Sequence, residues 1–199
     1  MLASADPVLA IDRRAVLANL RSVRSRLGGR ALIAVLKDNA YGHGLLPLAE
    51  VLHDAGVRRF AVGSVEEAFA VQAPGRPIDV LNLRLFRRED SPRIVARGIV
   101  QSVFTVEQAD LLAAAARERG RQARVHLNVD TGLRRFGVPV EAAPALLASL
   151  RARSELRVEG VFSTLTEDPA LDREQMTAFS ALLAEAGRRP GEERREGRH

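Results

Sequence analysis

Short apolar runs alternate along most of the chain with longer segments of helical period, and this alternation constrains the fold more than any other feature. Most of the short runs are apolar along their whole length, which is typical of strands buried on both faces of a parallel sheet. The runs that predict strands are 31–36, 59–63, 78–83, 100–105, 124–129 and 158–165. The segments that predict helices are 13–27, 46–55, 65–73, 92–97, 106–119, 140–153 and 172–187.

This alternation predicts an α/β fold in which right-handed crossovers join parallel strands. Six strands suit either an open doubly wound sheet or most of a (β/α)8 barrel of the TIM type. A complete barrel typically takes about 250 residues, whereas the chain has 199. We expect one domain over residues 1–187. The remaining segment, 188–199, has no apolar residue except Pro190, so it is either a disordered tail or an out-of-frame sequence.

Composition excludes several classes of protein. The absence of cysteine rules out disulfides, thiolate metal sites and cysteine nucleophiles, and we predict no metal. No run approaches the roughly 18 apolar residues of a membrane span, and the N-terminus lacks the pattern of a secretory signal. We therefore expect a soluble, cytoplasmic protein with no membrane partner.

The net charge of +5 raises nucleic-acid binding as an alternative. The arginines are scattered, mostly beside acidic residues, and aromatic residues that could stack on bases make up only 4% of the chain. These features favour an arginine-rich composition of the source proteome, and we predict no nucleic-acid partner.

Lys37 is the only lysine in the chain, although Lys and Arg together number 30. It directly follows the apolar run ALIAVL, so we expect it at the carboxyl end of a strand, where α/β folds bind ligands. The next residues, DNAYGHG, are turn formers. A lysine amine can form an imine with an aldehyde, whereas an arginine guanidinium cannot. This difference favours a chemical role for Lys37, the alternative being a surface lysine retained by chance.

Residues 31–44 resemble the pyridoxal-phosphate attachment region of alanine racemases, which reads Lys-x-Asn-Ala-Tyr-Gly-His-Gly. The segment 11–20 is similar to the end of that family's opening strand and its first helix. The resemblance implies that pyridoxal 5'-phosphate is the cofactor, that Lys37 joins it through an imine, and that Lys37 is one of two bases for the α-proton. It also implies that Tyr41 donates its hydroxyl to the cofactor phosphate. For His43 we expect a structural role in the loop.

A second motif, VHLNVDTGLRRFG over residues 125–137, resembles the family's V-H-x-K/N-V-D-T-G-M-G-R-x-G. The resemblance implies that Arg135 contacts the cofactor's phenolic oxygen and the substrate carboxylate, to which a guanidinium can fork. Asn128 would support this arginine. Asp130 could alternatively serve only as a turn or helix cap. Arg134 stands where the family pattern has glycine.

The resemblance extends over roughly residues 8–187. Thr164 takes the place of a family histidine, and residues 172–179 resemble a family helix with a Gln-x-x-x-Phe pattern. The implied activity is interconversion of L-alanine and D-alanine for peptidoglycan, by a (β/α)8 barrel enzyme that acts as a homodimer on a small amino acid substrate.

Parts of the family pattern have no counterpart here. These are the last two barrel strands and the C-terminal β-domain, whose tyrosine is the second base. Because Tyr41 is the only tyrosine, we expect a truncated chain, with about six of eight strands and impaired activity, for which a homodimer is doubtful. The alternatives are a non-catalytic pyridoxal-phosphate-binding barrel and a fragment that folds only with a partner chain.

Overall fold

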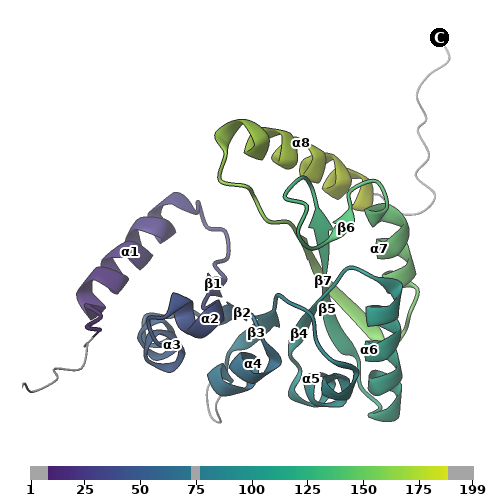
Figure 1. Cartoon of the computed structure of the whole chain (residues 1–199), viewed down its shortest axis with the longest axis horizontal. Coiled ribbons are helices and arrows are strands. Elements are labelled where there is room, and N and C mark those ends of the chain that lie inside the picture. Colours follow the sequence, from purple (N-terminus) through teal and green to yellow (C-terminus); the bar gives the residue numbers. More distant parts are fainter. Residues whose placement is uncertain (1–8, 73–76, 188–199) are drawn as a thin grey trace, which may run out of the picture. The chain divides into compact units, whose positions relative to one another are not determined.

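The computed structural model describes residues 9–72 and 77–187. The chain forms two compact units, Met1–Phe86 and Arg87–His199. The predicted tail at 188–199, and Ala73 at the end of one predicted helix, lie outside the described residues. Strands and helices alternate in both units (Figure 1).

The first unit contains three parallel strands in the order β1-β2-β3. In their register, Ala34 is opposite Phe60, and Phe60 is opposite Val80. Helix α4 packs against β2 and β3, and α1 contacts α3. The elements are α1 (Arg13–Arg26), β1 (Ala34–Val35), α2 (Lys37–Tyr41), α3 (Leu45–Asp54), β2 (Arg59–Val62), α4 (Val65–Val71) and β3 (Asp79–Asn82).

In the second unit, β5 pairs in parallel with β4 on one side and with β7 on the other. Helices α6 and α7 pack on this sheet, and α8 contacts α7 (Figure 1). The elements are the 3-10 helix η1 (Arg88–Asp90), α5 (Ser91–Arg97), β4 (Val100–Val103), α6 (Val106–Glu118), β5 (Ala123–Asp130), β6 (Val138–Pro139), α7 (Ala143–Arg151), β7 (Leu156–Phe162) and α8 (Pro169–Ala186).

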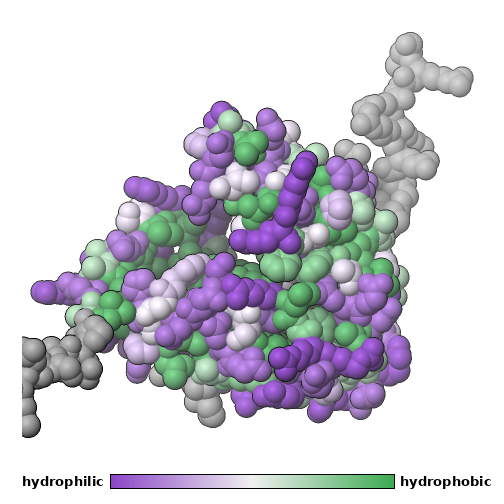
Figure 2. Space-filling model, viewed as in Figure 1, coloured by the Kyte–Doolittle hydropathy of each residue, from purple (hydrophilic) through white to green (hydrophobic). Residues whose placement is uncertain are grey.

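The strands form the core of each unit. Every residue of β4 is buried, and in β2 only Arg59 is exposed. Burial of three consecutive residues explains the apolar run at residues 60–62 in β2, whereas β4 also buries the polar Gln101 and Ser102. Apolar residues also form part of the surface (Figure 2). Among the large apolar side chains that are exposed is Val35 of β1. No helix among the described residues is both long and apolar enough to cross a membrane.

The predicted α/β class is confirmed, and each of the six predicted strands has a counterpart. Three elements were not predicted: α2, η1 and β6. Strand β6 has two residues, which pair with the end of β5, and so short a segment shows no period. The predicted strand 31–36 shrinks to Ala34–Val35. The assignment of residues 1–187 to one domain stays a prediction.

Candidate functional site

Lys37 lies at the carboxyl end of β1, where the chain enters an unusual turn. Leu36 directly follows the strand, and its N–H donates to the carbonyl of Ala61 on β2 at 2.7 Å. The four residues that follow the lysine have positive φ angles: Asp38, Asn39, Ala40 and Tyr41, at 53–55°. Helix α2 is therefore a single left-handed turn. For residues other than glycine this conformation costs about 1–2 kcal/mol each, so the surrounding structure must hold it.

Hydrogen bonds within the segment account for part of that support. The N–H of Gly42 donates to the Asp38 carbonyl at 3.0 Å, and the N–H of Gly44 donates to the Asn39 carbonyl at 3.0 Å. The Asn39 side-chain oxygen accepts from the N–H of Leu45 at 2.8 Å. This last bond satisfies a free donor at the start of α3, so the turn and the next helix stabilise each other.

Glu67 on α4 holds the same turn from outside. Its Oε1 accepts from the N–H of Asn39 at 2.8 Å, and its Oε2 accepts from the N–H of Gly63 at 2.8 Å. In sequence, Ser64 and Glu67 match the S-x-x-E pattern of a capping box. The Ser64 hydroxyl does accept from the N–H of Glu67 at 3.1 Å. The carboxylate, however, binds the lysine turn, a long-range role that the local pattern does not indicate.

An ion pair fixes the residue next to the lysine. Arg84, which follows β3, donates from Nη1 to Oδ1 of Asp38 at 2.9 Å and from Nη2 to Oδ2 at 2.8 Å. Sequence reasoning missed this pair, whose members are 46 positions apart. The carboxyl ends of β1 and β3 lie at the same edge of a parallel sheet. This shared edge is the only feature of the predicted fold that could have suggested the ion pair.

Lys37 and Tyr41 lie close together on the turn. The lysine Nζ is 5.8 Å from the centroid of the tyrosine ring. Lys37 is half-buried and Tyr41 is exposed. Within the described part of the chain, the lysine amine makes no hydrogen bond and no ion pair, which leaves it available for a ligand. His43 is directed to its own loop, with Nδ1 2.9 Å from the Ala40 carbonyl oxygen.

In the second unit, Asp130 closes a turn at the end of β5. Its Oδ1 accepts from the N–H of Gly132 at 2.9 Å and from the N–H of Arg134 at 3.0 Å. Arg134 has a φ of 55°, so it retains the left-handed conformation that glycine provides in the family pattern. Gly137 has no substitute, because a Cβ there would lie 2.5 Å from the backbone nitrogen of Asp130.

This turn presents Arg135 to solvent. Among the described residues, the Arg135 side chain has no hydrogen-bond or salt-bridge partner. Asn128 is buried within β5, opposite Phe162 of β7. No hydrogen bond joins the Asn128 side chain to Arg135 in the described part of the chain, so the supporting role of Asn128 stays a prediction. Lys37 and Tyr41 belong to the first unit, whereas Asn128 and Arg135 belong to the second.

Gln175 on α8 ties together the segments that follow β5 and β7. Its Nε2 donates to the Thr131 hydroxyl and to the Thr164 carbonyl, both at 3.1 Å. Its Oε1 accepts from the N–H of Thr166 at 3.1 Å. The Thr131 hydroxyl also lies 2.7 Å from that of Ser163. A buried amide with these partners fixes the loop that leads to Arg135.

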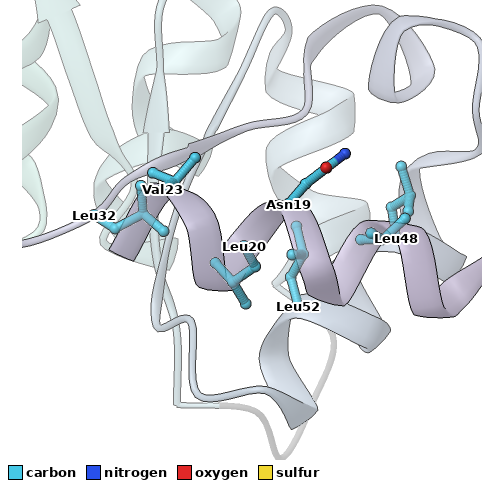
Figure 3. A pocket seen from close by; sticks show the side chains of 7 residues that line it. Asn19, Leu20, Val23, Leu32, Leu48 and Leu52 are labelled. Carbon is cyan, nitrogen blue, oxygen red and sulfur yellow. The ribbon is translucent and has the colours of Figure 1, made fainter. Parts of the chain in front are cut away.

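The first unit also contains a cavity of about 240 Å³ between α1, α3 and the approach to β1 (Figure 3). Apart from Asn19, its lining is aliphatic: Val16, Leu20, Val23, Leu32, Leu48 and Leu52. An aliphatic lining offers no partner for a phosphate or a carboxylate, so this cavity does not fit the predicted cofactor. Among the described residues, no group of three or more His, Asp or Glu side chains could hold a metal ion.

Comparison with known proteins identifies the family. The family model for the N-terminal domain of alanine racemase matches residues 11–195. The chain belongs to the alanine racemase N-terminal domain family. An alanine racemase of Geobacter sp. (strain M21) is 37% identical over 198 residues, which are 98% of this chain and 52% of the relative. One of Mycobacterium bovis is 34% identical over 184 residues, which are 88% of this chain and 48% of the relative.

Solved structures of the family agree with the fold. Alanine racemase from D-cycloserine-producing Streptomyces lavendulae matches with a TM-score of 0.80 and 35% identity, over 88% of this chain and 48% of that one. The enzyme from E. faecalis matches with a TM-score of 0.77 and 30% identity, over 87% and 49%. The chain thus spans about half the length of the relatives it matches. The implied family and its (β/α)8 barrel class are confirmed, while the roles of individual site residues stay predictions.

Proposed function

We propose that this chain supplies the pyridoxal-phosphate-binding part of an alanine racemase, with Lys37 as the residue that holds the cofactor. The observation that carries the proposal is the lysine at the carboxyl end of β1, which a left-handed turn presents and which has no hydrogen-bond or ion-pair partner among the described residues. Strained backbone conformations of this kind persist mainly at functional sites. Membership of the alanine racemase N-terminal domain family supports the same role.

The residues present fit pyridoxal phosphate. An amine suits the cofactor aldehyde, and the Tyr41 hydroxyl on the same exposed turn suits its phosphate. Arg135 offers a guanidinium that has no partner among the described residues and that suits a phenolate or a carboxylate. When bound, the cofactor supplies an electron sink that stabilises negative charge at the α-carbon of an amino acid. The substrate we propose is alanine.

We assign different roles in racemisation to different residues of this chain. Lys37 would take or return the α-proton on one face of the substrate, while Arg135 would orient the substrate carboxylate. Racemisation also needs a base on the opposite face. Tyr41 is the only tyrosine in the chain, and it is assigned to the phosphate. We therefore propose that these 199 residues alone bind the cofactor but do not racemise alanine at an enzymatic rate.

Two assays on the purified chain test this proposal. With pyridoxal phosphate, the chain should develop visible absorbance, and borohydride should fix the cofactor to Lys37, as mapped by peptide mass. Lys37→Arg is the matched control because it keeps the charge and removes the only side-chain amine. Absorbance that is undiminished in Lys37→Arg would refute the cofactor role.

The second assay follows conversion of L-alanine to D-alanine by a coupled enzyme. We expect no turnover near the ~10 per second of a typical enzyme. Turnover at that rate would refute the proposal that these residues alone lack a second base. Labelling of Lys37 without turnover also fits the alternative of a non-catalytic cofactor-binding barrel. Addition of the remaining half of a relative distinguishes the two hypotheses, since this chain should gain racemase activity only if it is part of a racemase.

A further inference from the structure

The ion pair between Asp38 and Arg84 lies beside Lys37, and the motif does not account for it. The family pattern Lys-x-Asn leaves the position of Asp38 open. Strands β1, β2 and β3 are parallel, so the residues that follow them share one edge of the sheet. A Cβ built on Gly63 would lie 3.2 Å from the Lys37 Cβ and 3.3 Å from the Arg84 Cζ. The lysine and the guanidinium therefore flank the same backbone atom.

The geometry of the pair restrains both partners. Two parallel N–H···O bonds, of 2.9 and 2.8 Å, join the guanidinium to the Asp38 carboxylate, and such a fork fixes orientation as well as distance. Arg84 is itself tied to the fully buried Asn82, whose Nδ2 donates to the Arg84 carbonyl at 3.3 Å. The carboxylate next to Lys37 is thus anchored, through Arg84, to the buried end of β3.

Stability alone does not explain the pair. Its side chains are 45% and 50% exposed, and half-exposed ion pairs add little to folding stability because water screens them. The left-handed turn is held mainly by Glu67 and by hydrogen bonds within the segment. What the pair changes is the charge next to the lysine, since an unpaired Asp38 carboxylate would favour the ammonium form, which cannot attack an aldehyde.

We propose that Asp38 and Arg84 form a positioning pair that orients the Lys37 turn and cancels the charge beside its amine; this inference rests on the proposed cofactor role of Lys37. The other titratable or charged groups at the turn are Tyr41, His43 and Glu67. The Glu67 carboxylate accepts from two backbone N–H groups, and His43 is directed to the Ala40 carbonyl. Among these charged groups, the pair is the one whose carboxylate belongs to the residue next to Lys37 and whose guanidinium lies beside the same Gly63 position as the lysine.

The single lysine makes a sharp experiment possible, because the N-terminal amine is the only other amine in the chain. The amine of Lys37 adds to the aldehyde of pyridoxal phosphate, a C=N bond forms, and water leaves. Borohydride then delivers hydride to the carbon, and a solvent proton goes to the nitrogen, leaving a stable secondary amine. Peptide mass mapping of the full chain at several pH values gives labelling of Lys37 relative to the N-terminal amine of the same molecule.

We expect Arg84→Ala to lower relative labelling of Lys37 near neutral pH by about fivefold, equivalent to about 1 kcal/mol. In this variant, the curve of Lys37 labelling against pH should move to higher pH, because the Asp38 carboxylate that remains favours the ammonium form of the lysine. Asp38→Asn should move the profile to lower pH, because the guanidinium that remains disfavours that form. Asparagine tolerates a positive φ, so the turn is preserved in this variant. In the double variant, the pH midpoint of Lys37 labelling should return close to that of the unsubstituted chain.

Arg153→Ala is the matched control, because it breaks the ion pair with Asp110 in the second unit. This control should leave the profile unchanged, and thermal unfolding should show that every variant is folded. Profiles that stay unchanged, or that shift in the same direction in both single variants, would overturn the positioning pair while leaving Lys37 as the cofactor residue. A wild-type chain without preferential labelling of Lys37 would instead overturn the proposed function itself.

Discussion

At the scale of single residues, positive φ angles outside glycine gather beside both candidate site segments. Asp38, Asn39, Ala40 and Tyr41 follow the lysine, and Arg134 precedes Arg135. A left-handed conformation is costly for these residues, and in each segment a carboxylate compensates by accepting backbone N–H groups. Glu67 does so for Asn39, and Asp130 does so for Arg134. Five of the six positive-φ residues other than glycine in the described part of the chain thus lie in these two segments, and the sixth, Glu167, does not.

Arg134 provides the prediction at this scale. Arg134→Gly removes a left-handed penalty of about 1–2 kcal/mol and adds about 0.5–1 kcal/mol of backbone entropy cost. We therefore expect the free energy of unfolding to rise by about 0.5–1 kcal/mol, measured by urea unfolding with an unchanged m-value. Arg135→Gly is the control, because Arg135 does not have a positive φ, and it should destabilise the chain. Equal destabilisation by both variants would show that Arg134 is not strained.

At the scale of elements, local capping sets where several helices begin. Helix α6 has the most complete arrangement among those described. The Thr105 hydroxyl accepts from the N–H of Gln108 at 3.2 Å, while the Gln108 side-chain oxygen accepts from the N–H of Thr105 at 3.2 Å and from that of Phe104 at 2.8 Å. These bonds satisfy donors that a helix start leaves free.

Removal of this cap should weaken α6 measurably. We expect Thr105→Ala to lower the free energy of unfolding by about 1 kcal/mol and to speed hydrogen exchange at the Gln108 amide. Thr105→Ser keeps the hydroxyl and should stay close to the unsubstituted chain. If serine and alanine behaved alike at this position, the threonine methyl group, and not the cap, would be the stabilising feature.

Element boundaries were predictable to the extent that local patterns define them. The sequence 106–119 predicts a helix, and α6 is Val106–Glu118. The turn α2 was not predictable, because no propensity favours four consecutive left-handed residues that are not glycine. It is held by hydrogen bonds within the segment and by Glu67, which is distant in sequence and accepts from the N–H of Asn39. Contacts between residues so far apart in sequence produce no periodic pattern from which they could be predicted.

At the scale of the whole molecule, the ion pair between Arg117 and Glu155 makes stability depend on pH. Arg117, on α6, donates through Nε to Glu155, just before β7, at 3.0 Å. The hydrogen bond from Arg117 lowers the pKa of the Glu155 carboxyl from its ordinary value of 4.5. A lowered pKa means that the folded state favours the carboxylate, so the stabilisation is present above about pH 4.5 and is lost as pH falls through the lower folded value.

Glu155→Gln should therefore be less stable than the unsubstituted chain near neutral pH and should approach it in acid. Thermal unfolding over a pH series measures the difference. Arg117→Gln removes the donor and should give the same convergence. A difference that stayed constant into strong acid would mean that the stabilisation comes from packing and not from the carboxylate charge.

The sequence by itself determined the α/β class, the positions of the six main strands, the family and the lysine that we propose for the cofactor. These depend on local apolar periods and on a contiguous motif, which a linear reading contains. Only the tertiary structure decided how Lys37 is presented and which groups surround it. The left-handed turn, the carboxylate of Glu67 and the guanidinium of Arg84 come together because parallel strands bring their carboxyl ends to one edge. That proximity arises from folding, and no local pattern contains it.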